Sequence, residues 1–320
     1  MNLINQFAAR RSRRIASLLV LGAVLIALAV SYRHYYYARP IGSGPAGPAV
    51  NHEPFQRPWS QRRVVLLGLG DSVTDGLGAS PGKSYFQRLV KNPGDEFPDM
   101  QGISLSRVLP KLEPVNLSMS GTTSIECIDY QLPKLSPYPE DVFGIVVITT
   151  GGNDLIHNYG RTPPREGAMY GAMRGEIDPW VEDFRQRMDT IISRCEATFP
   201  GGCRILITNI YDPSDGSGDI EMAGLPAWPD GLQVLSAWNQ ILAALPQRHS
   251  NVTLVDLRSE FLGHGVHCVQ FWHAYYRRSD PHYWYWDNLE DPNDRGYDAI
   301  RRLFLNAIVQ DVYPELIKSR

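Results

Sequence analysis

The sequence predicts an α/β fold in which a parallel sheet of five strands lies between two layers of helices. Five short apolar runs alternate with longer segments whose apolar residues recur at helical spacing. The runs are apolar throughout, which is typical of strands that are buried on both faces of a sheet. A further apolar segment near the N-terminus is long enough to span a membrane.

The first 61 residues are expected to lie outside this fold. Residues 1–14 carry an arginine cluster and are interpreted as a cytoplasmic basic segment. Residues 15–32 are interpreted as a transmembrane signal-anchor, because eighteen helical residues span roughly 27 Å. Residues 33–61 are rich in Pro and Gly and are expected to form a semi-extended tether, which leaves 62–320 as the folded domain.

This topology places the folded domain outside the cytoplasm, in a periplasmic or extracellular space. A cleaved signal peptide is the alternative, with Ala27-x-Ala29 or Ala29-x-Ser31 as its cleavage site. The tyrosines and arginine that follow Ser31 favour the anchor, because they are typical of a membrane interface.

The strands of the domain are predicted from the apolar runs, and its helices from apolar residues at helical spacing. The expected strands are residues 64–69, 115–117, 143–149, 204–210 and 252–257. The expected helices are about 84–91, 124–132, 179–198, 231–245 and 296–312. Insertions rich in Gly, Pro and polar residues separate several of them and are expected to surround the binding crevice.

The first strand runs directly into a candidate nucleophile. Residues 64–76 read V-V-L-L-G-L-G-D-S-V-T-D-G, and Gly68 and Gly70 allow a tight turn. Ser72 then follows the strand at its carboxyl end, where open α/β sheets bind ligands. A dinucleotide fingerprint is disfavoured because its third glycine is missing, and a G-x-S-x-G elbow fails because Thr74 replaces its last glycine.

Two later strands also end in small polar residues. Residues 114–122 read P-V-N-L-S-M-S-G-T, and residues 142–154 read V-F-G-I-V-V-I-T-T-G-G-N-D. In a parallel sheet both loops open on the same edge as Ser72. Gly70-Asp71-Ser72, Gly121 and Gly151-x-Asn153-Asp154 together resemble the three motif blocks of the SGNH (GDSL-type) hydrolase family, and the resemblance covers roughly residues 62–312.

The resemblance implies a flavodoxin-like three-layer fold and ester hydrolysis by a serine, with no metal or organic cofactor. Ser72 would be the nucleophile, which needs a base to take its proton. The implied donors to the oxyanion are the amides of Ser72 and Gly121 and the side chain of Asn153. The alternative interpretation is that Ser72 only caps a helix and that Asn153-Asp154 only form a turn that caps the next helix.

The base is the point at which the chain departs from the family. Members carry a histidine three residues after an aspartate and just before Pro-Asn, whereas here Asp291 and Asn288 stand at these positions. We predict His282 as the base and Asp287 as the acid that orients its ring, with Glu290 or Asp291 as alternative acids. The alternative bases are His157, then His264, His267 and His273, then Asp291 itself; an inactive site also remains open.

The four cysteines fit an oxidising compartment. Cys195 and Cys203 flank a predicted turn and are expected to form a disulfide, and Cys127 and Cys268 are candidates for a second pair. Free buried thiols are the alternative. A metal site is disfavoured because neither C-x-x-C nor H-E-x-x-H spacing is present.

A net charge of −3 argues against nucleic acid as a partner.

The motif blocks and the apolar N-terminal segment together predict an exported, membrane-tethered serine esterase. It would cleave an O-acetyl group on a glycan or a lipid ester through an acyl-enzyme on Ser72. An O-acyltransferase with the same intermediate is one alternative. A non-catalytic glycan-binding module is another, with sugar rings stacked on Tyr275, Tyr276, Tyr283, Trp284, Tyr285 and Trp286.

Overall fold

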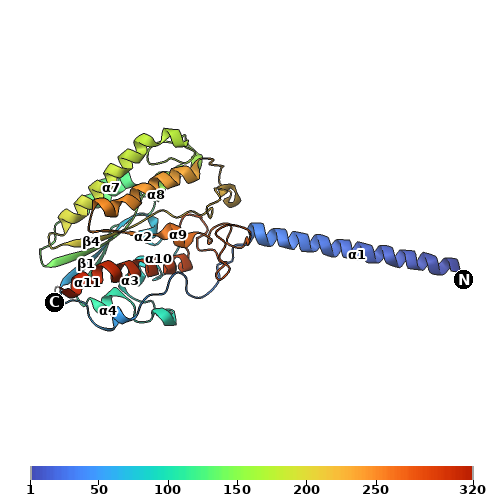
Figure 1. The fold of residues 1–320 in the computed structure, drawn as a ribbon, viewed down its shortest axis with the longest axis horizontal. Coiled ribbons are helices and arrows are strands. Elements are labelled where there is room, and N and C mark those ends of the chain that lie inside the picture. The colour runs from blue at the N-terminus through green and yellow to red at the C-terminus, as the bar shows by residue number, and fades with distance from the viewer. Residues whose placement is uncertain (1, 319–320) are drawn as a thin grey trace.

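The computed structural model describes residues 2–318, and its domain is built on one parallel sheet (Figure 1). The strands are β1 (Arg63–Gly70), β2 (Leu112–Asn116), β3 (Val142–Thr149), β4 (Cys203–Thr208) and β5 (Val252–Val255). Their order is β2-β1-β3-β4-β5, and every neighbouring pair is parallel. The predicted α/β fold with five parallel strands is confirmed, and the three strands that precede the motif blocks are adjacent.

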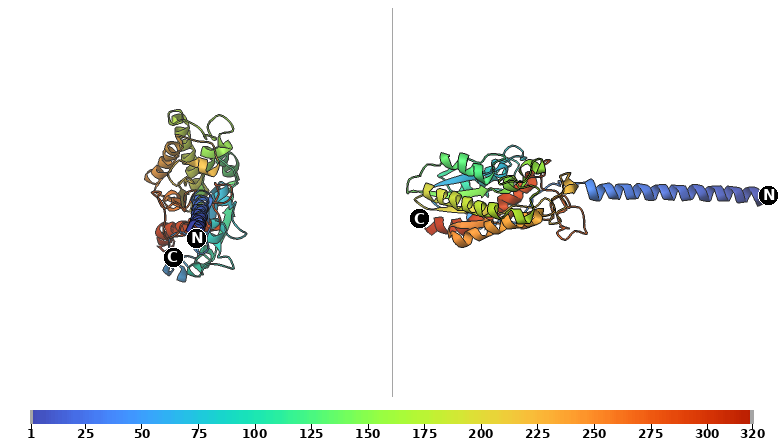
Figure 2. Two further views of the ribbon diagram at one scale, coloured as in Figure 1. Left: turned by 90° about the vertical axis from the view of Figure 1, so that its right-hand side faces the viewer. Right: turned by 90° about the horizontal axis from the view of Figure 1, so that it is seen from above.

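Helices cover both faces of this sheet (Figures 1 and 2). Side chains alternate along β1, so that Val64 and Leu66 join one core cluster whereas Val65 and Leu67 join the other. The first cluster receives α3 (Tyr85–Val90), α4 (Leu105–Val108), α9 (Leu257–Phe261), α10 (Asp294–Ala307) and α11 (Tyr313–Lys318). The second receives α7 (Asp178–Thr198) and α8 (Gly231–Arg248).

Three further short α-helices lie at the carboxyl edge of the sheet. They are α2 (Ser72–Asp75), α5 (Ser124–Glu126) and α6 (Gly152–Ile156). The predicted helix 124–132 is α5 followed by a π-helical turn, η3 (Cys127–Gln131). The predicted helix 296–312 is likewise α10 followed by the π-helical turn η8 (Ile308–Val312).

The segment between the N-terminal helix and β1 lies on the domain, so the prediction of a semi-extended tether is wrong. Ala46, Phe55 and Trp59 are buried in the core beside α10 and α11. The Ala46 amide donates to Asp298 Oδ2 at 3.0 Å. A Cβ on Gly47 would lie 2.6 Å from the Cα of Ala299, which explains the packing: small residues let this backbone lie directly on α10.

The predicted disulfides are also wrong. All four cysteines are buried free thiols. The Cys127 thiol donates to Gln131 Oε1 at 3.6 Å, and the Cys203 sulfur accepts from Asn251 Nδ2 at 3.8 Å. Each of these sulfurs therefore contacts a polar side chain instead of a second sulfur, and burial raises the pKa of Cys127 to about 12.

The N-terminal helix α1 (Asn2–Tyr37) projects from the domain, at the end opposite α11 (Figures 1 and 2). Its segment Arg13–Tyr37 has a mean hydropathy of 2.5 over its most apolar stretch, and none of that stretch is buried against the domain. By length and composition α1 meets the criteria for a membrane-spanning helix, and a signal sequence meets the same criteria. An apolar helix at this end of the chain is thus confirmed.

Candidate active site

Ser72 lies at the turn between β1 and α2, and Gly70 makes this turn possible. Gly70 has a φ of +117°, and a Cβ there would lie 1.6 Å from the carbonyl oxygen of Thr149. Asp71 caps α2, because its Oδ1 accepts from the Val73 amide at 3.1 Å. Ser72 is therefore held at the first position of a helix, at the carboxyl end of a central strand.

Asp71 is buried beside this turn. Its Oδ1 also accepts from the Thr149 hydroxyl at 2.8 Å. That hydroxyl lies 2.7 Å from the Thr74 hydroxyl, which in turn lies 2.6 Å from the hydroxyl of Tyr85. Burial raises the pKa of Asp71 to about 7, although the hydrogen bonds from Thr149 and Val73 oppose the shift. Asp71 thus joins β1, α2, α3 and β3 around the serine.

Gly121 and Asn153 come from the two strands on either side of β1. Gly121 has a φ of +82°, and no atom beyond its two chain neighbours lies within 4 Å of the position that a Cβ would take. The Asn153 side chain, on α6, donates through Nδ2 to the Thr122 carbonyl at 3.0 Å. The Thr122 hydroxyl donates to the Gly70 carbonyl at 2.9 Å. These bonds connect all three motif blocks at one edge of the sheet.

Asp154, the last residue of the third block, points away from this edge. Its carboxylate accepts from the amide and the hydroxyl of Ser124, at 2.7 and 2.5 Å, and lies 3.6 Å from Arg187 Nη2. Asp154 therefore fixes α6 to α5 and α7, which sets the position of Asn153 beside it.

Asp291 lies against Ser72 from the loop that precedes α10. The Ser72 side chain interacts with the Asp291 carboxylate and lowers its pKa, although burial has a larger effect and the net shift is upward. Oδ2 of Asp291 accepts from Asn288 Nδ2 at 2.6 Å. Oδ1 is buried and, among the described residues, has no partner of standard hydrogen-bond geometry. One carboxylate oxygen of Asp291 therefore remains available to accept a proton.

Asn288 also fixes the loop that carries Asp291. Its Oδ1 accepts from the amides of Glu290 and Asp291, at 3.2 and 3.1 Å. The two positions that hold an aspartate and a histidine in the resembled family are thus in direct side-chain contact here, as Asn288 and Asp291. The Tyr211 hydroxyl donates to the Glu290 carbonyl and holds the loop from the other side.

His282 and Asp287 are not among the residues that line the cavity beside Ser72. His282 pairs through Nδ1 with Asp280, and its ring lies on Gly42, where a Cβ would be 2.5 Å from the ring Cδ2. Asp280 also accepts from Arg295 Nη2 at 2.5 Å. Asp287 is exposed. The structure therefore does not bring this predicted pair to Ser72.

The other candidate histidines are engaged elsewhere. His264 stacks on Trp284 with ring centroids 3.5 Å apart, and burial lowers its pKa to about 4. His267 contacts Gln270 Oε1 at 2.7 Å and stacks on His273. His157 ends α6 and is not among the residues that line the cavity.

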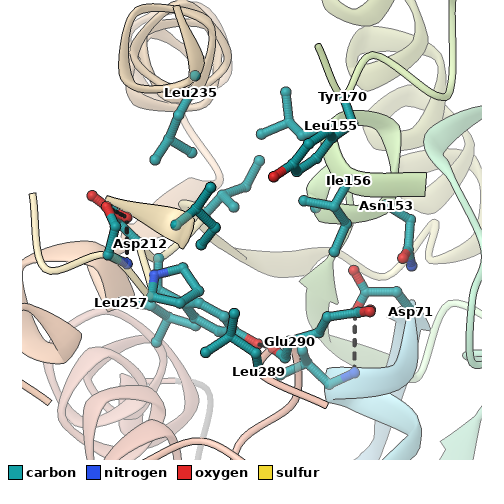
Figure 3. Close-up of a pocket in the computed structure, with 18 of the residues that line it drawn as sticks. Asp71, Asn153, Leu155, Ile156, Tyr170, Asp212, Leu235, Leu257, Leu289 and Glu290 are labelled. Atoms are coloured by element: carbon teal, nitrogen blue, oxygen red, sulfur yellow. Dashed lines mark hydrogen bonds between the residues drawn. The ribbon is translucent and has the colours of Figure 1, made fainter. Parts of the chain in front are cut away.

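A cavity of about 150 Å³ extends from Ser72 between β3, β4 and α8. Figure 3 shows Asp71 and Asn153 at one side of it and Leu235 and Asp212 at the other. Most of its lining is apolar, with Leu155, Ile156, Tyr159, Tyr170, Ile210, Ile220, Leu225, Trp228, Leu232, Leu235, Leu257 and Leu289. Within residues 2–318 its lining includes no Lys, Arg or His, and no cluster of three or more metal-ligating side chains occurs.

Glu290 is a lining residue that sequence reasoning assigned only as a possible orienting acid. Its side chain faces the cavity beside Asp71 (Figure 3). Burial raises the pKa of Glu290 to about 8, and the neighbouring Asp291 contributes to the rise. At neutral pH Glu290 is therefore mainly protonated, and the cavity accommodates neutral groups better than anions.

The match to a protein-family model covers residues 69–299 and falls on this set of motifs; the family is described as the GDSL-like lipase/acylhydrolase family. Solved structures similar to this chain include a GDSL-family lipolytic protein from Veillonella parvula (13% identity, 77% of this chain and 99% of that chain, TM-score 0.47).

A second similar structure is an extracellular lipase from Streptomyces rimosus (14% identity, 78% of this chain and 99% of that chain, TM-score 0.48). A third is an acetylxylan esterase from Geobacillus stearothermophilus (12% identity, 78% of this chain and 94% of that chain, TM-score 0.45). No curated protein matches the chain. The family match spans most of the chain and contains the Ser72, Gly121 and Asn153 blocks, so the chain belongs to the GDSL-like lipase/acylhydrolase family of ester-cleaving hydrolases.

Proposed function

We propose that the protein is an exported, membrane-anchored serine esterase in which Asp291 takes the proton of Ser72. The observation that carries this proposal is the electrostatic interaction of the Asp291 carboxylate with the side chain of Ser72, a residue that lines an apolar cavity. No histidine lines the cavity, whereas Glu290, the neighbour of Asp291, does. Asp291 also has a buried oxygen without a standard hydrogen-bond partner among the described residues. Asp291 therefore replaces His282 as the proposed base.

The proposed reaction has two halves. In the first, the Asp291 carboxylate takes the proton as Ser72 Oγ attacks the ester carbonyl. The oxyanion accepts hydrogen bonds from the Ser72 and Gly121 amides and from the Asn153 Nδ2 hydrogen that Thr122 does not use. The C–O bond then breaks, and the alcohol leaves with the proton from Asp291. In the second half, water gives a proton to Asp291 as it attacks the acyl-enzyme. The bond between the acyl carbon and Ser72 Oγ then breaks, Asp291 returns the proton to Ser72 Oγ, and the carboxylic acid is released.

A carboxylate is a weaker base than histidine, and two features of the site offset part of this difference. Burial raises the pKa of Asp291, which brings its proton affinity closer to what a general base near neutral pH requires. The 2.6 Å bond from Asn288 fixes the carboxylate and engages only Oδ2. Asn288 thus orients Asp291 as the acid of a triad orients its histidine.

The apolar lining favours one of the two expected substrate classes. An acetyl group on a glycan would leave the far side of the cavity, near Leu235 and Trp228, without contacts. A longer acyl chain would bury apolar surface there, at about 25 cal/mol per Å². We therefore assign the cavity to the acyl chain of a neutral ester, which a lipid ester supplies.

The glycan-binding alternative has less support. Three members of the aromatic cluster that would stack on sugars are buried in the core, at 6% exposure for Tyr283 and 1% for Trp284 and Tyr285. Trp284 already stacks on His264.

The experiment measures hydrolysis of nitrophenyl acetate, butyrate, octanoate and laurate by the full chain in detergent, beside Ser72→Ala. We expect kcat/KM to rise with chain length until the cavity is filled, and Ser72→Ala to show no turnover above background. Equal activity of the wild type and Ser72→Ala would refute the esterase, and a preference for acetate would refute the acyl assignment. Leu235→Trp at the far side of the cavity should shorten the preferred chain without loss on acetate.

A further inference from the structure

Exposed aromatic side chains gather where α1 meets the domain. Phe271 and Trp272, in the loop after α9, are 62% and 49% exposed, and Tyr36 of α1 is 41% exposed. The Tyr35 ring centroid lies 5.8 Å from that of Phe271 and 5.0 Å from that of Trp272. Tyr36 lies 6.4 Å from Trp272. We name these residues, with Tyr32, the aromatic collar; it joins two segments far apart in sequence.

A hydrogen bond fixes the two halves of the collar. Gln270 Nε2 donates to the backbone carbonyl of Tyr35 at 2.8 Å. His267 supports this bond, because its Nδ1 contacts Gln270 Oε1 at 2.7 Å. The exposed rings are therefore held in place by buried neighbours, so that their exposure is a built feature of the surface.

The length of α1 places the collar at a membrane boundary. Arg13 and Arg14 mark the polar end of the apolar stretch. A helix needs about 20 residues to cross the roughly 30 Å hydrocarbon layer, and a count from Ile15 reaches His34. Tyr35 then lies at the boundary, where Trp and Tyr concentrate in membrane proteins. Since Phe271 and Trp272 contact Tyr35, they lie at the same depth.

The domain is held in one orientation relative to α1. Arg39 Nη2, two residues beyond the helix, donates to the Met222 carbonyl at 2.7 Å. The Tyr283 amide donates to the Pro40 carbonyl at 2.8 Å, and the Arg39 guanidinium lies over the Tyr283 ring. The chain after α1 continues along the domain surface without a free tether, so the angle of α1 sets the face that the domain turns toward the bilayer.

That face is the one that carries the cavity. Residues 213–225, the cavity wall, line the cavity with Pro213, Ser214, Gly218, Ile220 and Leu225. The outer side of the same wall contacts the collar region: Ser217 Oγ lies 3.0 Å from His267 Nε2, and Met222 accepts from Arg39. Figure 1 shows α2, which begins with Ser72, on the side of the sheet from which α1 leaves.

We propose that the aromatic collar docks the domain on the headgroup layer of the membrane that holds α1. The surface it fits is a lipid bilayer, because the collar continues the apolar surface of α1 and consists of the residue types that favour this depth. Docking places the cavity wall over the lipid, so that an ester acyl chain passes from the bilayer into the cavity. The docking rests on α1 as an anchor, and the route of the substrate rests on the proposed esterase.

The first experiment measures depth independently of activity. The full chain is reconstituted in phosphatidylcholine vesicles whose acyl chains are brominated close to the headgroup, and tryptophan quenching is compared with that of Trp272→Phe. We expect the emission lost in Trp272→Phe to be the most strongly quenched part of the wild-type signal. The same fractional quenching in both proteins would place Trp272 outside the bilayer and overturn the docking.

The second experiment separates docking from chemistry with two esters that share a leaving group. Methylumbelliferyl butyrate is offered in solution, and methylumbelliferyl oleate is offered in the vesicles. We expect Phe271→Ser combined with Trp272→Ser to retain the butyrate rate and to lose about tenfold on oleate, since the cavity is no longer held at the bilayer. Tyr130→Ser, at a similarly exposed tyrosine on η3 (55%), is the matched control and should retain both rates.

Equal losses on the two esters, or no loss on either, would overturn the assignment of the collar. If the wild type hydrolyses neither ester, the proposed esterase fails by itself, and the quenching of Trp272 still decides whether the collar docks.

Discussion

Replacement of Asp291 by asparagine removes the proposed base while the shape of the site is kept. In Asp291→Asn the new amide oxygen would stand where Oδ2 now accepts from Asn288 at 2.6 Å, so the side chain keeps its orientation. The NH₂ group of the new side chain then faces Ser72 and cannot take a proton. General base catalysis contributes about 100- to 10,000-fold, and we expect Asp291→Asn to lose kcat/KM by this factor, about 3–5 kcal/mol in transition-state stabilisation.

The pH dependence of kcat/KM is a second test of Asp291 as the base. The base must be ionised, and burial raises the pKa of Asp291 above its usual value. Wild-type kcat/KM should therefore fall as the pH drops through that raised pKa, and the residual activity of Asp291→Asn should lack this limb. The assay follows nitrophenyl butyrate hydrolysis by the full chain from about pH 5 to 9.

Two further variants decide between Asp291 and the base predicted from sequence. His282→Ala and Asp287→Asn should stay within about threefold of the wild type, because His282 pairs with Asp280 and Asp287 is exposed. The reasoning is refuted if Asp291→Asn keeps wild-type kcat/KM, and all the more if His282→Ala loses it.

Three predictions concern stability. Gly70→Ala should lower the free energy of unfolding in urea by about 3 kcal/mol because its Cβ meets Thr149, whereas Gly121→Ala, with open space, should cost about 1 kcal/mol. Asp298→Ala should cost about 3–5 kcal/mol in the same assay, since it leaves the buried Arg301 and Arg302 without this partner; the exposed Asp178→Ala should cost under about 0.5 kcal/mol. Burial raises the folded pKa of Asp71 to about 7, so the folded state binds more protons than the unfolded chain above about pH 4, and stability falls as pH rises toward 7. Asp71→Asn should remove that fall, which amounts to at most about 4 kcal/mol in the free energy of unfolding between pH 4 and pH 8. An unchanged pH dependence of stability in Asp71→Asn would contradict the raised pKa of Asp71.

The sheet and its carboxyl edge were predictable because they depend on local patterns. Apolar runs such as 143–149 identify buried strands, and the polar residues that end them must meet at one edge once the strands are parallel. Ser72, Gly121 and Asn153 were placed together for this reason. The strand order was not predictable from these patterns, since it depends on how crossovers pack.

The base was harder to predict, because it depends on contacts between segments about 220 residues apart. Sequence reasoning searched for a histidine and chose His282, whose ring is occupied by Asp280 and Gly42 in the fold. The signal for the base that we propose instead is positional: Asp291 and Asn288 keep the family's spacing, and their side chains are in contact.

The segment before β1 shows a second limit of sequence reasoning. Its Pro and Gly content suggested a free tether, but small residues such as Gly47 let its backbone lie on α10 beside Ala299. Composition indicates how a segment behaves in isolation. Whether another element offers a surface on which its backbone can pack is known only from the folded structure.

The central claim is that Ser72 is a nucleophile activated by Asp291. The most direct measurement is labelling of the full chain in membranes with a fluorophosphonate, followed by peptide mapping of the modified residue. The account predicts a phosphonylated Ser72, no label in Ser72→Ala, and labelling slowed by about 100-fold or more in Asp291→Asn. An unlabelled wild type, or equal labelling of wild type and Asp291→Asn, would contradict it.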